Sequence, residues 1–447
     1  MSLIIPANTL SSGGFAVDNS CRFNSGSSDT LTRTNSSTSN TWTFSAWIKR
    51  SSIIGSNKYL ISWGTSGTNG TGIGFSDSGT SSLFYYSEDG GSNRYKLTSA
   101  SYRDISAWYH VVVKSDSNAI TFYVNGEEPT QAWSNGSAGQ NLSSSTMTIG
   151  NWVTASLYPS NYMAEVCFID GTALAPTDFG EFDEDSGIWK PIDVSGLTFG
   201  TNGFYLDFEN SGALGADVSG NTNNFTVNNL TAVDQSTDTC TNNFATLNPL
   251  YVGLNANFGL SEGNLKGLNS GAGDNNYVSN FGVSSGKWYV EAKATVDSEA
   301  YGTIGIVATD SVVQTNGSWL GSSNDSFYYS QNGHIGTNGG STSTGHATYA
   351  TNDIISVALN LDDNELLWYK NGAVQNSGTA TAITANKEYF IGGRVYKSST
   401  GWEFNFGSPS FAISSGNTDG NSRGNFEYAP PSGYLSLCTA NLSEVLG

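Results

Sequence analysis

Two segments of this chain carry the clearest alternation of hydrophobic and polar residues. Residues 120–127 read Ile-Thr-Phe-Tyr-Val-Asn-Gly-Glu, and residues 366–372 read Leu-Leu-Trp-Tyr-Lys-Asn-Gly. Side chains alternate between the two faces of a β-strand, and Asn-Gly tolerates the positive φ angles of a type I′ turn. A Trp-Tyr run precedes each segment, at Trp108 and at Trp288. The pattern predicts two β-hairpins, each at the centre of its own antiparallel domain.

Further strand-like runs surround both hairpins, with clusters of Gly, Ser and Asn between them. The clearest is 41–49, in which apolar side chains recur at every second position from Trp42 to Ile48. This spacing predicts an all-β fold made of two antiparallel β-sandwiches, with one short helical turn at 176–180, which begins with a proline. The other predicted strands are 59–63, 72–75, 83–86, 95–97, 108–114, 146–150, 163–170, 204–209, 287–296, 302–309, 326–330, 354–361, 365–370, 389–393 and 402–406.

The spacing of these runs also predicts the domain boundaries. Weak periodicity and many Asn, Thr and Gly residues mark a connecting segment, while paired prolines near the C-terminus would interrupt a strand ladder. No heptads indicate a coiled-coil shaft. We expect an N-terminal arm at 1–14, a first sandwich at 15–235, a linker and extended entry segment at 236–279, a second sandwich at 280–410 and a C-terminal tail at 411–447.

The net charge of the chain limits the classes of molecule that it can bind. Only 13% of the 447 residues are charged, against roughly a quarter in an ordinary globular protein, and the formal net charge is −20. An acidic surface repels phosphate groups, so we expect neither nucleic-acid binding nor docking on anionic membranes. A surface rich in neutral polar groups suits hydroxyl-rich ligands, and it suits tight packing inside a large particle equally well.

The N-terminal residues, the apolar runs and the cysteines indicate the cellular compartment in which we expect the protein to be made. Residues 1–6 lack the basic and apolar regions of a secretory signal, and no run approaches the roughly 20 apolar residues that span a bilayer. We therefore expect synthesis in a cytoplasm and no membrane insertion. The four cysteines are far apart in the sequence and form no Cys-x-x-Cys pair, which favours buried free thiols: Cys21, Cys167, Cys240 and Cys438.

Four motifs of the first domain occur together in one known family. They are the Trp strand 43–49, the hairpin formed by 108–111 and 122–126, the strand 164–166, and the acidic turn 217–221 that follows Asp207. In this combination the domain, roughly 15–225, resembles the laminin-G-like, concanavalin A-like sandwiches. The acidic turn follows the hairpin here, an order that departs from that of the family, as in a circular permutation.

The second domain carries a different set of motifs. They are 286–291, 304–306, 357–361, 367–372 and 404–407. In this order the motifs resemble the SPRY sandwich. Together with the Thr- and Asn-rich link and the Pro-Pro-Ser-Gly-Tyr tail, the two domains resemble virion proteins of tailed bacteriophages. Fold alone does not determine function, so this last step rests on association.

Paired carboxylates are the first catalytic candidates, because glycosidases with concanavalin-like folds place two of them on one strand face. Glu181, Asp183 and Asp185 have the required even spacing. Their spacers are not both apolar, however, and Ser186-Gly187 follows immediately, which is typical of a loop. The sequence favours a solvated acidic loop.

Other ionisable residues lack a catalytic pattern. Glu165 and Asp170 are an odd number of residues apart and would point to opposite faces of one strand. The three histidines, His110, His334 and His346, have no suitably placed nucleophile nearby in the sequence. We therefore expect no enzyme.

A calcium site is the better candidate for a small binding site. Calcium takes carboxylate and carbonyl oxygens, and the segment 207–221 offers both. The family resemblance implies Asp207 and Asp217 as side-chain ligands, and Asn221 lies in the same segment. The alternative is that residues 217–220 form only an Asx-type turn.

Aromatic residues on loops are the candidates for ligand binding, because a flat ring stacks on the apolar face of a sugar. The alternative is that they fill sandwich cores or subunit interfaces. The candidates next to segments rich in Ser, Asn and Gly are Trp133, Trp152, Tyr158, Tyr162 and, in the second domain, Trp319.

These observations predict a non-enzymatic phage protein on the virion surface, a tail fibre, spike or head-decorating protein that binds a host surface glycan or protein through its β-sandwich loops. Its expected partners are other virion proteins and a host cell-surface glycan or receptor. We also expect a symmetric homo-oligomer, a trimer by our estimate. A purely structural capsid decoration or cement protein is the alternative, and a glycan-degrading hydrolase is a distant third.

Overall fold

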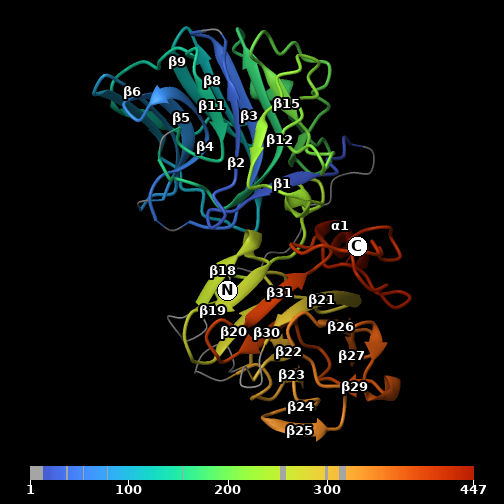
Figure 1. Cartoon of the computed structure of the whole chain (residues 1–447). Coiled ribbons are helices and arrows are strands. Elements are labelled where there is room, and N and C mark those ends of the chain that lie inside the picture. The colour runs from blue at the N-terminus through green and yellow to red at the C-terminus, as the bar shows by residue number, and fades with distance from the viewer. Residues whose placement is uncertain are drawn as a thin grey trace. The chain divides into compact units, whose positions relative to one another are not determined.

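The computed structural model describes residues 14–36, 39–53, 55–77, 79–153, 155–251, 258–296, 301–311 and 319–446. The chain divides into two compact units, of which one is Leu10–Asn243 and the other contains Phe244–Gly447. Each unit is built from antiparallel sheets (Figure 1). The all-β architecture of two antiparallel sandwiches predicted from the sequence is confirmed.

In the first unit two large sheets form the sandwich. One has the strand order β17 (Gln235–Ser236), β1 (Ser20–Phe23), β12 (Asn161–Asp170), β3 (Trp42–Arg50), β8 (Trp108–Asp116) and β9 (Ala119–Val124), and β15 (Phe204–Leu206) pairs with β12. The other has the order β10 (Gln131–Asn135), β7 (Ser92–Thr98), β6 (Ser82–Asp89), β5 (Asn69–Ser76), β4 (Lys58–Ser66), β11 (Thr146–Ile149), β2 (Thr30–Thr34) and β16 (Thr226–Asn228).

Short elements complete this unit. Strands β13 (Gly180–Phe182) and β14 (Trp189–Pro191) form a small hairpin. The 3₁₀ helices are η1 (Pro176–Asp178) and η2 (Ala232–Asp234), and η1 begins at the proline that the sequence indicated.

The alternating apolar residues of β3 face the other sheet. Trp42, Phe44, Ala46 and Ile48 are all fully buried in the core. Trp42 meets the ring of Trp63 on β4 edge to face, with 5.1 Å between ring centroids. This contact joins the two sheets, because β3 and β4 belong to different ones.

The second unit is also a sandwich of two sheets. One has the order β18 (Phe258–Ser261), β19 (Lys266–Asn269), β31 (Gly401–Asn405), β21 (Lys287–Thr295), β26 (Ile354–Asn360), β27 (Glu365–Lys370) and β28 (Ala373–Val374), with β29 (Thr381–Ala382) also on β27. The other has the order β20 (Asn275–Val278), β30 (Tyr389–Val395), β22 (Thr303–Ala308), β23 (Ser326–Ser330), β24 (Ile335–Thr337) and β25 (Gly340–Ser343). The unit also contains the 3₁₀ helices η3 (Glu262–Asn264) and η5 (Asn376–Gly378) and the helix α1 (Thr439–Leu446).

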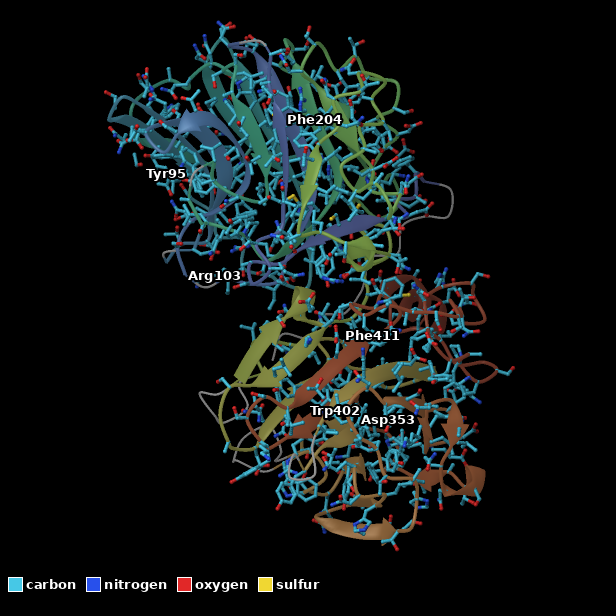
Figure 2. All side chains as sticks on the ribbon, viewed as in Figure 1. Tyr95, Arg103, Phe204, Asp353, Trp402 and Phe411 are labelled. Carbon is cyan, nitrogen blue, oxygen red and sulfur yellow. The ribbon has the colours of Figure 1, made fainter. Side chains whose placement is uncertain are left out.

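Large aromatic side chains fill the core of the second unit as well. Trp288, Trp368 and Trp402 belong to one buried cluster. Trp402, labelled in Figure 2, has no exposed surface. The predicted Trp strands of this domain therefore provide its core.

The first Asn-Gly pair forms its turn but does not join two long strands. Asn125 and Gly126 have φ angles of 50° and 81°, and Val124 and Glu127 exchange two backbone hydrogen bonds of 2.9 and 3.1 Å. Beyond Glu127 the chain passes to β10 in the other sheet. The partner of β9 is β8, which is reached through Ser117-Asn118, where both φ angles are also positive. The expected pairing of the two strands that flank Asn125-Gly126 is therefore wrong, whereas the hairpin of 108–111 with 122–126 is present as β8 and β9.

The second Asn-Gly pair joins β27 to β28, a strand of two residues. Both asparagines have the same further role. Asn125 accepts a hydrogen bond from the backbone N–H of His110, and Asn371 accepts one from that of Ile354, each at 2.8 Å. The Asn side chain thereby closes the end of the neighbouring strand.

The described parts of the segments expected as linker and tail include residues that pair or hydrogen-bond with the second sandwich. The range 236–279 contains β18, β19 and β20, which pair within the second unit. In the tail, the backbone N–H groups of Glu427 and Tyr428 donate to the buried carboxylate of Glu291 at 2.9 and 2.7 Å. Polar residues dominate these segments, so their pairing leaves little periodicity to detect.

Two observations bear on membranes and thiols. Among the described residues no helix has the length and apolar character needed to cross a membrane. All four cysteines are free thiols; Cys240 is partly buried, and Cys21, Cys167 and Cys438 are buried.

Candidate functional site: an aromatic groove on the first sandwich

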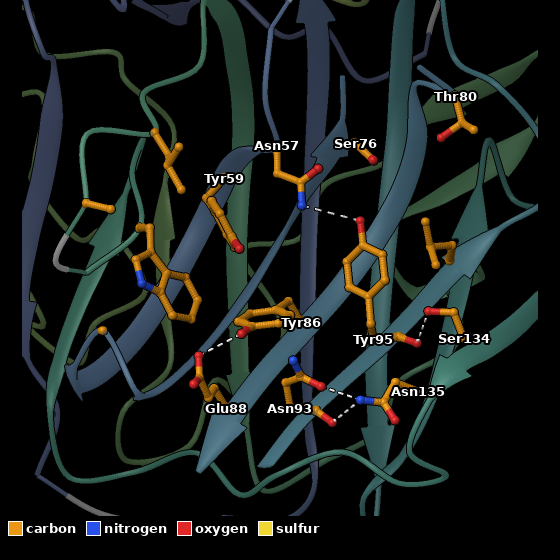
Figure 3. A pocket seen from close by; sticks show the side chains of 15 residues that line it. Asn57, Tyr59, Ser76, Thr80, Tyr86, Glu88, Asn93, Tyr95, Ser134 and Asn135 are labelled. Atoms are coloured by element: carbon orange, nitrogen blue, oxygen red, sulfur yellow. Dashed lines mark hydrogen bonds between the residues drawn. The ribbon is translucent and has the colours of Figure 1, made fainter. Parts of the chain in front are cut away.

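An open groove of about 780 Å³ lies on the outer face of the sheet that contains β4 to β7 and β10 (Figure 3). Strand β6 shows how the sequence builds this face. Leu83 and Tyr85 point into the core between the sheets, while Phe84 and Tyr86 join a separate aromatic cluster on the opposite side. Because a strand alternates its side chains, one apolar run serves both the core and the groove.

The neighbouring strand β5 is nearly bare on this face. Gly70, Gly72 and Gly74 recur at every second position. A Cβ atom added to Gly72 would lie 2.5 Å from Cδ1 of Tyr59 and 3.1 Å from Cζ3 of Trp152. The glycines therefore let two aromatic rings lie directly against the backbone of the sheet.

Five aromatic side chains pack together on this face of the sheet. The ring centroids of Trp152 and Tyr59 are 4.7 Å apart, and those of Trp152 and Tyr86 are 5.5 Å apart. Tyr95 contacts Phe84 at 5.5 Å and Tyr86 at 6.1 Å. Trp152 is 4% exposed and Tyr59 5% exposed, whereas Tyr86 and Tyr95 are half-buried. The two tyrosines of β6 and β7 therefore offer the accessible rings.

Polar groups surround the rings. The amide of Asn57 donates to the hydroxyl of Tyr95 at 3.4 Å, and the hydroxyl of Tyr86 donates to Oε2 of Glu88 at 2.7 Å. Asn135 donates to the backbone carbonyl of Asn93 at 2.8 Å. Figure 3 shows these pairs beside the tyrosine rings.

The phenols remain donors at ordinary pH. Burial, together with the hydrogen bond to Glu88, raises the pKa of Tyr86 to about 12. Burial also raises the pKa of Tyr59 above its usual value. The groove thus combines flat apolar rings with amide, hydroxyl and carboxylate groups that can hydrogen-bond hydroxyls.

Of the five aromatic residues selected from the sequence, the structure brings only Trp152 into this groove. Trp133 lies on β10 but packs against the core, edge to face with Tyr85 and under the ammonium group of Lys96. Tyr162 is 1% exposed and lies beside the buried Lys49. Tyr158 is half-buried and does not line the groove. Of the five, Trp152 and Tyr162 are buried, whereas Trp133, Tyr158 and Trp319 are half-buried.

Trp319 lines a smaller hollow in the second unit. Its ring lies 5.2 Å from that of Tyr328, and the guanidinium carbon of Arg394 is 5.2 Å from its centroid. Arg394 is itself paired with Asp274 and donates to the backbone carbonyl of Tyr301 at 2.6 Å. Trp319 therefore contributes to a cluster held together by an internal ion pair.

The residues expected to bind calcium form a hydrogen-bonded turn. Both oxygens of Asp217 accept backbone N–H groups, from Tyr205 at 2.9 Å, Ser219 at 2.9 Å and Asn223 at 2.7 Å. Asn221 donates to two backbone carbonyls, and Asp207 accepts the N–H of Glu209. Within the described part of the chain, no group of three or more His, Cys, Asp or Glu residues is placed to hold a metal. This donor set does not fit calcium, and the geometry favours the Asx-type turn.

The acidic segment 181–185 has a structural role at its centre. Asp183 is 2% exposed; it accepts hydrogen bonds from the backbone and hydroxyl of Ser186 and pairs with Lys190 at 3.0 Å. These contacts fix the turn between β13 and β14. The carboxylate therefore stabilises a hairpin.

His110 lies next to a serine but cannot act as its base. The indole N–H of Trp189 donates to Nδ1 of His110 at 2.9 Å, and Nε2 lies 2.9 Å from the hydroxyl of Ser45. Because Nδ1 accepts, the proton of the neutral ring is on Nε2 and points at Ser45. Burial lowers the pKa of His110 to about 3. Ser45 is consequently not activated as a nucleophile.

Sequence reasoning missed most of the groove. Tyr59, Tyr86 and Tyr95 come from β4, β6 and β7, and only strand pairing brings them together. One signal was available: the glycines at 70, 72 and 74 share the period of a strand, and they occur beside runs rich in tyrosine. Such spacing indicates a strand face against which something else packs.

Parts of this chain are similar to solved structures, among them the SPRY domain of human HERC1 (15% identity, covering 35% of this chain and 96% of that one, TM-score 0.28) and a native heptameric SAP-like pentraxin from Limulus polyphemus (20% identity, covering 36% of this chain and 78% of that one, TM-score 0.29). No curated protein matches the chain. Residues 24–172 match the concanavalin A-like lectin/glucanases superfamily and residues 287–409 match the SPRY domain. The chain therefore contains a laminin-G-like, concanavalin A-like domain followed by an SPRY domain.

Proposed function

We propose that this protein is a non-enzymatic carbohydrate-binding protein and that the groove on the first sandwich is its glycan site. The observation that carries the proposal is the combination of two half-buried tyrosine rings with uncharged amide and hydroxyl groups in one open groove. A sugar ring has an apolar face for stacking and hydroxyls at its edge. The groove supplies a partner for each.

The groove favours binding over hydrolysis. A glycosidase needs two carboxyl groups on either side of the scissile bond. Among the described residues that line the groove, Glu88 is the single carboxylic acid. Neither Asp183 nor the pair of Ser45 and His110 supplies an alternative catalytic group, because these side chains are buried and hydrogen-bonded to other residues of the chain.

We further propose that the protein is displayed on a bacteriophage particle, as a tail fibre, spike or head-decorating protein, where it attaches to a host surface glycan. Support comes from the combination of the two domains with the Thr- and Asn-rich link and the tail, as in the virion proteins that the sequence resembles. Other virion proteins would be its neighbours, and a homotrimer is the assembly we expect.

The test uses the purified full-length chain on a glycan array, followed by isothermal titration of the glycans that bind. Immunogold labelling of intact particles with an antibody against the chain tests the second proposal. Binding to a defined set of glycans that is lost in Tyr86→Ala and Tyr95→Ala would support the groove. Binding to purified capsid shells, without binding to any glycan or cell, would instead support the structural alternative.

A further inference from the structure

We propose that the groove selects neutral saccharides and rejects anionic ones, such as uronates and sialylated, sulfated or phosphorylated glycans. This inference deepens the proposed function and rests on it. It is based on the charges in and around the groove, which are independent of the stacking of a sugar on the tyrosine rings.

The groove carries one negative charge and no positive one in its described lining. Glu88 is its only charged residue; the others are aromatic, aliphatic, glycine, amide or hydroxyl residues. Two residues outside the described part of the chain lie in the sequence between lining residues, Ser78 between Ser76 and Thr80 and Thr154 between Trp152 and Ala155, and both are uncharged. An anionic sugar would therefore lose water without gaining a cation.

Two of the nearest cations in the sequence, Lys58 and Lys96, face away from the groove. Lys58 precedes Tyr59, but it lines a different hollow together with Arg50 and Asp77. Lys96 follows Tyr95, but its ammonium group donates to the backbone carbonyl of Ile120 on the core side. Strand alternation explains both cases, because neighbours in a strand point to opposite faces.

Glu88 is held where a bound sugar would meet it. It follows Tyr86 by two residues on β6, so the two side chains share a face. The hydrogen bond from the hydroxyl of Tyr86 fixes Oε2 beside the accessible ring. A sugar stacked on Tyr86 would place its substituents next to this carboxylate. A hydroxyl there can donate to Glu88, whereas a carboxylate or sulfate is repelled.

The test measures the affinity of the full-length chain for matched polysaccharides that differ only in charge, by titration calorimetry in 150 mM NaCl. Suitable pairs are dextran with carboxymethyl-dextran, and methyl-esterified with de-esterified polygalacturonan, together with asialo- and sialylated lactosamine oligomers. We expect the neutral member of each bound pair to bind at least tenfold more tightly. Glu88→Gln should reduce this ratio at least threefold. Asp89→Asn, the adjacent exposed residue outside the groove lining, should leave it unchanged.

Three results would overturn the inference. The wild-type chain could bind the anionic member equally or more tightly, which would contradict charge selection alone and leave glycan binding intact. The ratio could respond equally to Glu88→Gln and Asp89→Asn, which would assign it to the overall charge of −20 instead of the groove. Failure of every member of every pair to bind would contradict the proposed function and this inference with it.

Discussion

Trp152 and Tyr59 meet at 4.7 Å between ring centroids, inclined by 45°, above the unsubstituted Cα of Gly72. Trp152 belongs to the segment that follows β11, while Tyr59 belongs to β4. Their contact builds the floor of the groove, and it requires a residue without a side chain at position 72. The shape of the groove thus depends on the absence of a side chain at Gly72.

The first prediction concerns this glycine. Gly72→Ala should destabilise the fold by about 1–3 kcal/mol, because the new methyl group overlaps Tyr59 and forces the rings apart. Glycan affinity should fall in the same variant. Urea unfolding and titration calorimetry measure the two effects. Gly26→Ala is the control, because nothing lies within 4 Å of its added Cβ, and it should change neither quantity. Unaltered stability in Gly72→Ala would contradict the packing.

A second prediction concerns the accessible rings. Tyr86→Ala and Tyr95→Ala should each weaken glycan binding by about 1 kcal/mol, or roughly fivefold, because each removes a stacking surface. Tyr396→Ala removes an exposed tyrosine of the second unit and should leave the affinity unchanged. If all three variants bind glycan like the wild type, the groove is not the site.

The third prediction is a pH dependence that comes from Glu165. This carboxyl is 7% exposed, and the hydroxyl of Tyr205 donates to it at 2.6 Å. Burial raises its pKa from 4.5 to about 7. The folded state therefore binds a proton more tightly than the unfolded state, so this stabilisation is complete below pH 4.5 and is lost as the pH rises through 7.

Glu165→Gln should remove that loss, which is worth roughly 3 kcal/mol at most. Urea unfolding at pH 4.5, 6 and 8 measures it. Glutamine keeps the shape of the side chain at a backbone position with a φ of 51°, so backbone strain is matched between the two proteins. Parallel pH profiles of wild type and variant would show that Glu165 does not titrate in this way. The pH dependence that comes from His110 has the opposite sign. Because burial lowers its pKa from 6.5 to about 3, the folded state loses stability relative to the unfolded state as the pH falls below 6.5.

A fourth prediction tests calcium. Because three backbone N–H groups already occupy the oxygens of Asp217, addition of calcium after chelation should shift the thermal midpoint by less than about 1 °C. Differential scanning fluorimetry with magnesium as the comparison is sufficient. A calcium-specific rise of several degrees that disappears in Asp217→Asn would instead restore the site suggested by the family resemblance.

The fifth prediction concerns the C-terminal segment. Glu291 has no exposed surface and accepts hydrogen bonds from two backbone N–H groups of residues 427–428, from Tyr289 and from Asn405. Glu291→Ala would leave these donors unpaired, so we expect a loss of about 2–4 kcal/mol and faster proteolysis near residue 427. Limited proteolysis with mass spectrometry measures the second effect. Glu365 is an exposed residue of β27, so a protease should cleave the Glu365→Ala variant at the same rate as the wild type.

Alternation along single strands was sufficient to predict the fold class. The apolar face of β3 and the Trp strands at 288, 368 and 402 could be predicted because a buried face leaves a period of two in the sequence. The Asn-Gly turns could also be predicted, because few residue types adopt the positive φ angles that such turns require. What the local pattern could not decide was which strand each turn would pair: β9 pairs with β8 through Ser117-Asn118, whereas the chain beyond Asn125-Gly126 passes to the other sheet.

The candidate site depended on the tertiary structure. Trp133 and Trp152 look equivalent in the sequence, yet one packs against the core and the other forms the floor of the groove. Tyr86 follows Tyr59 by 27 residues and Tyr95 follows Tyr86 by 9, and the three meet because β4, β5, β6 and β7 are neighbours in one sheet. The local sequence specifies which side chains alternate along each strand. Pairing between distant strands decides which side chains lie together on one face of the sheet, because a shift of the pairing register by one residue moves every side chain of a strand to the opposite face.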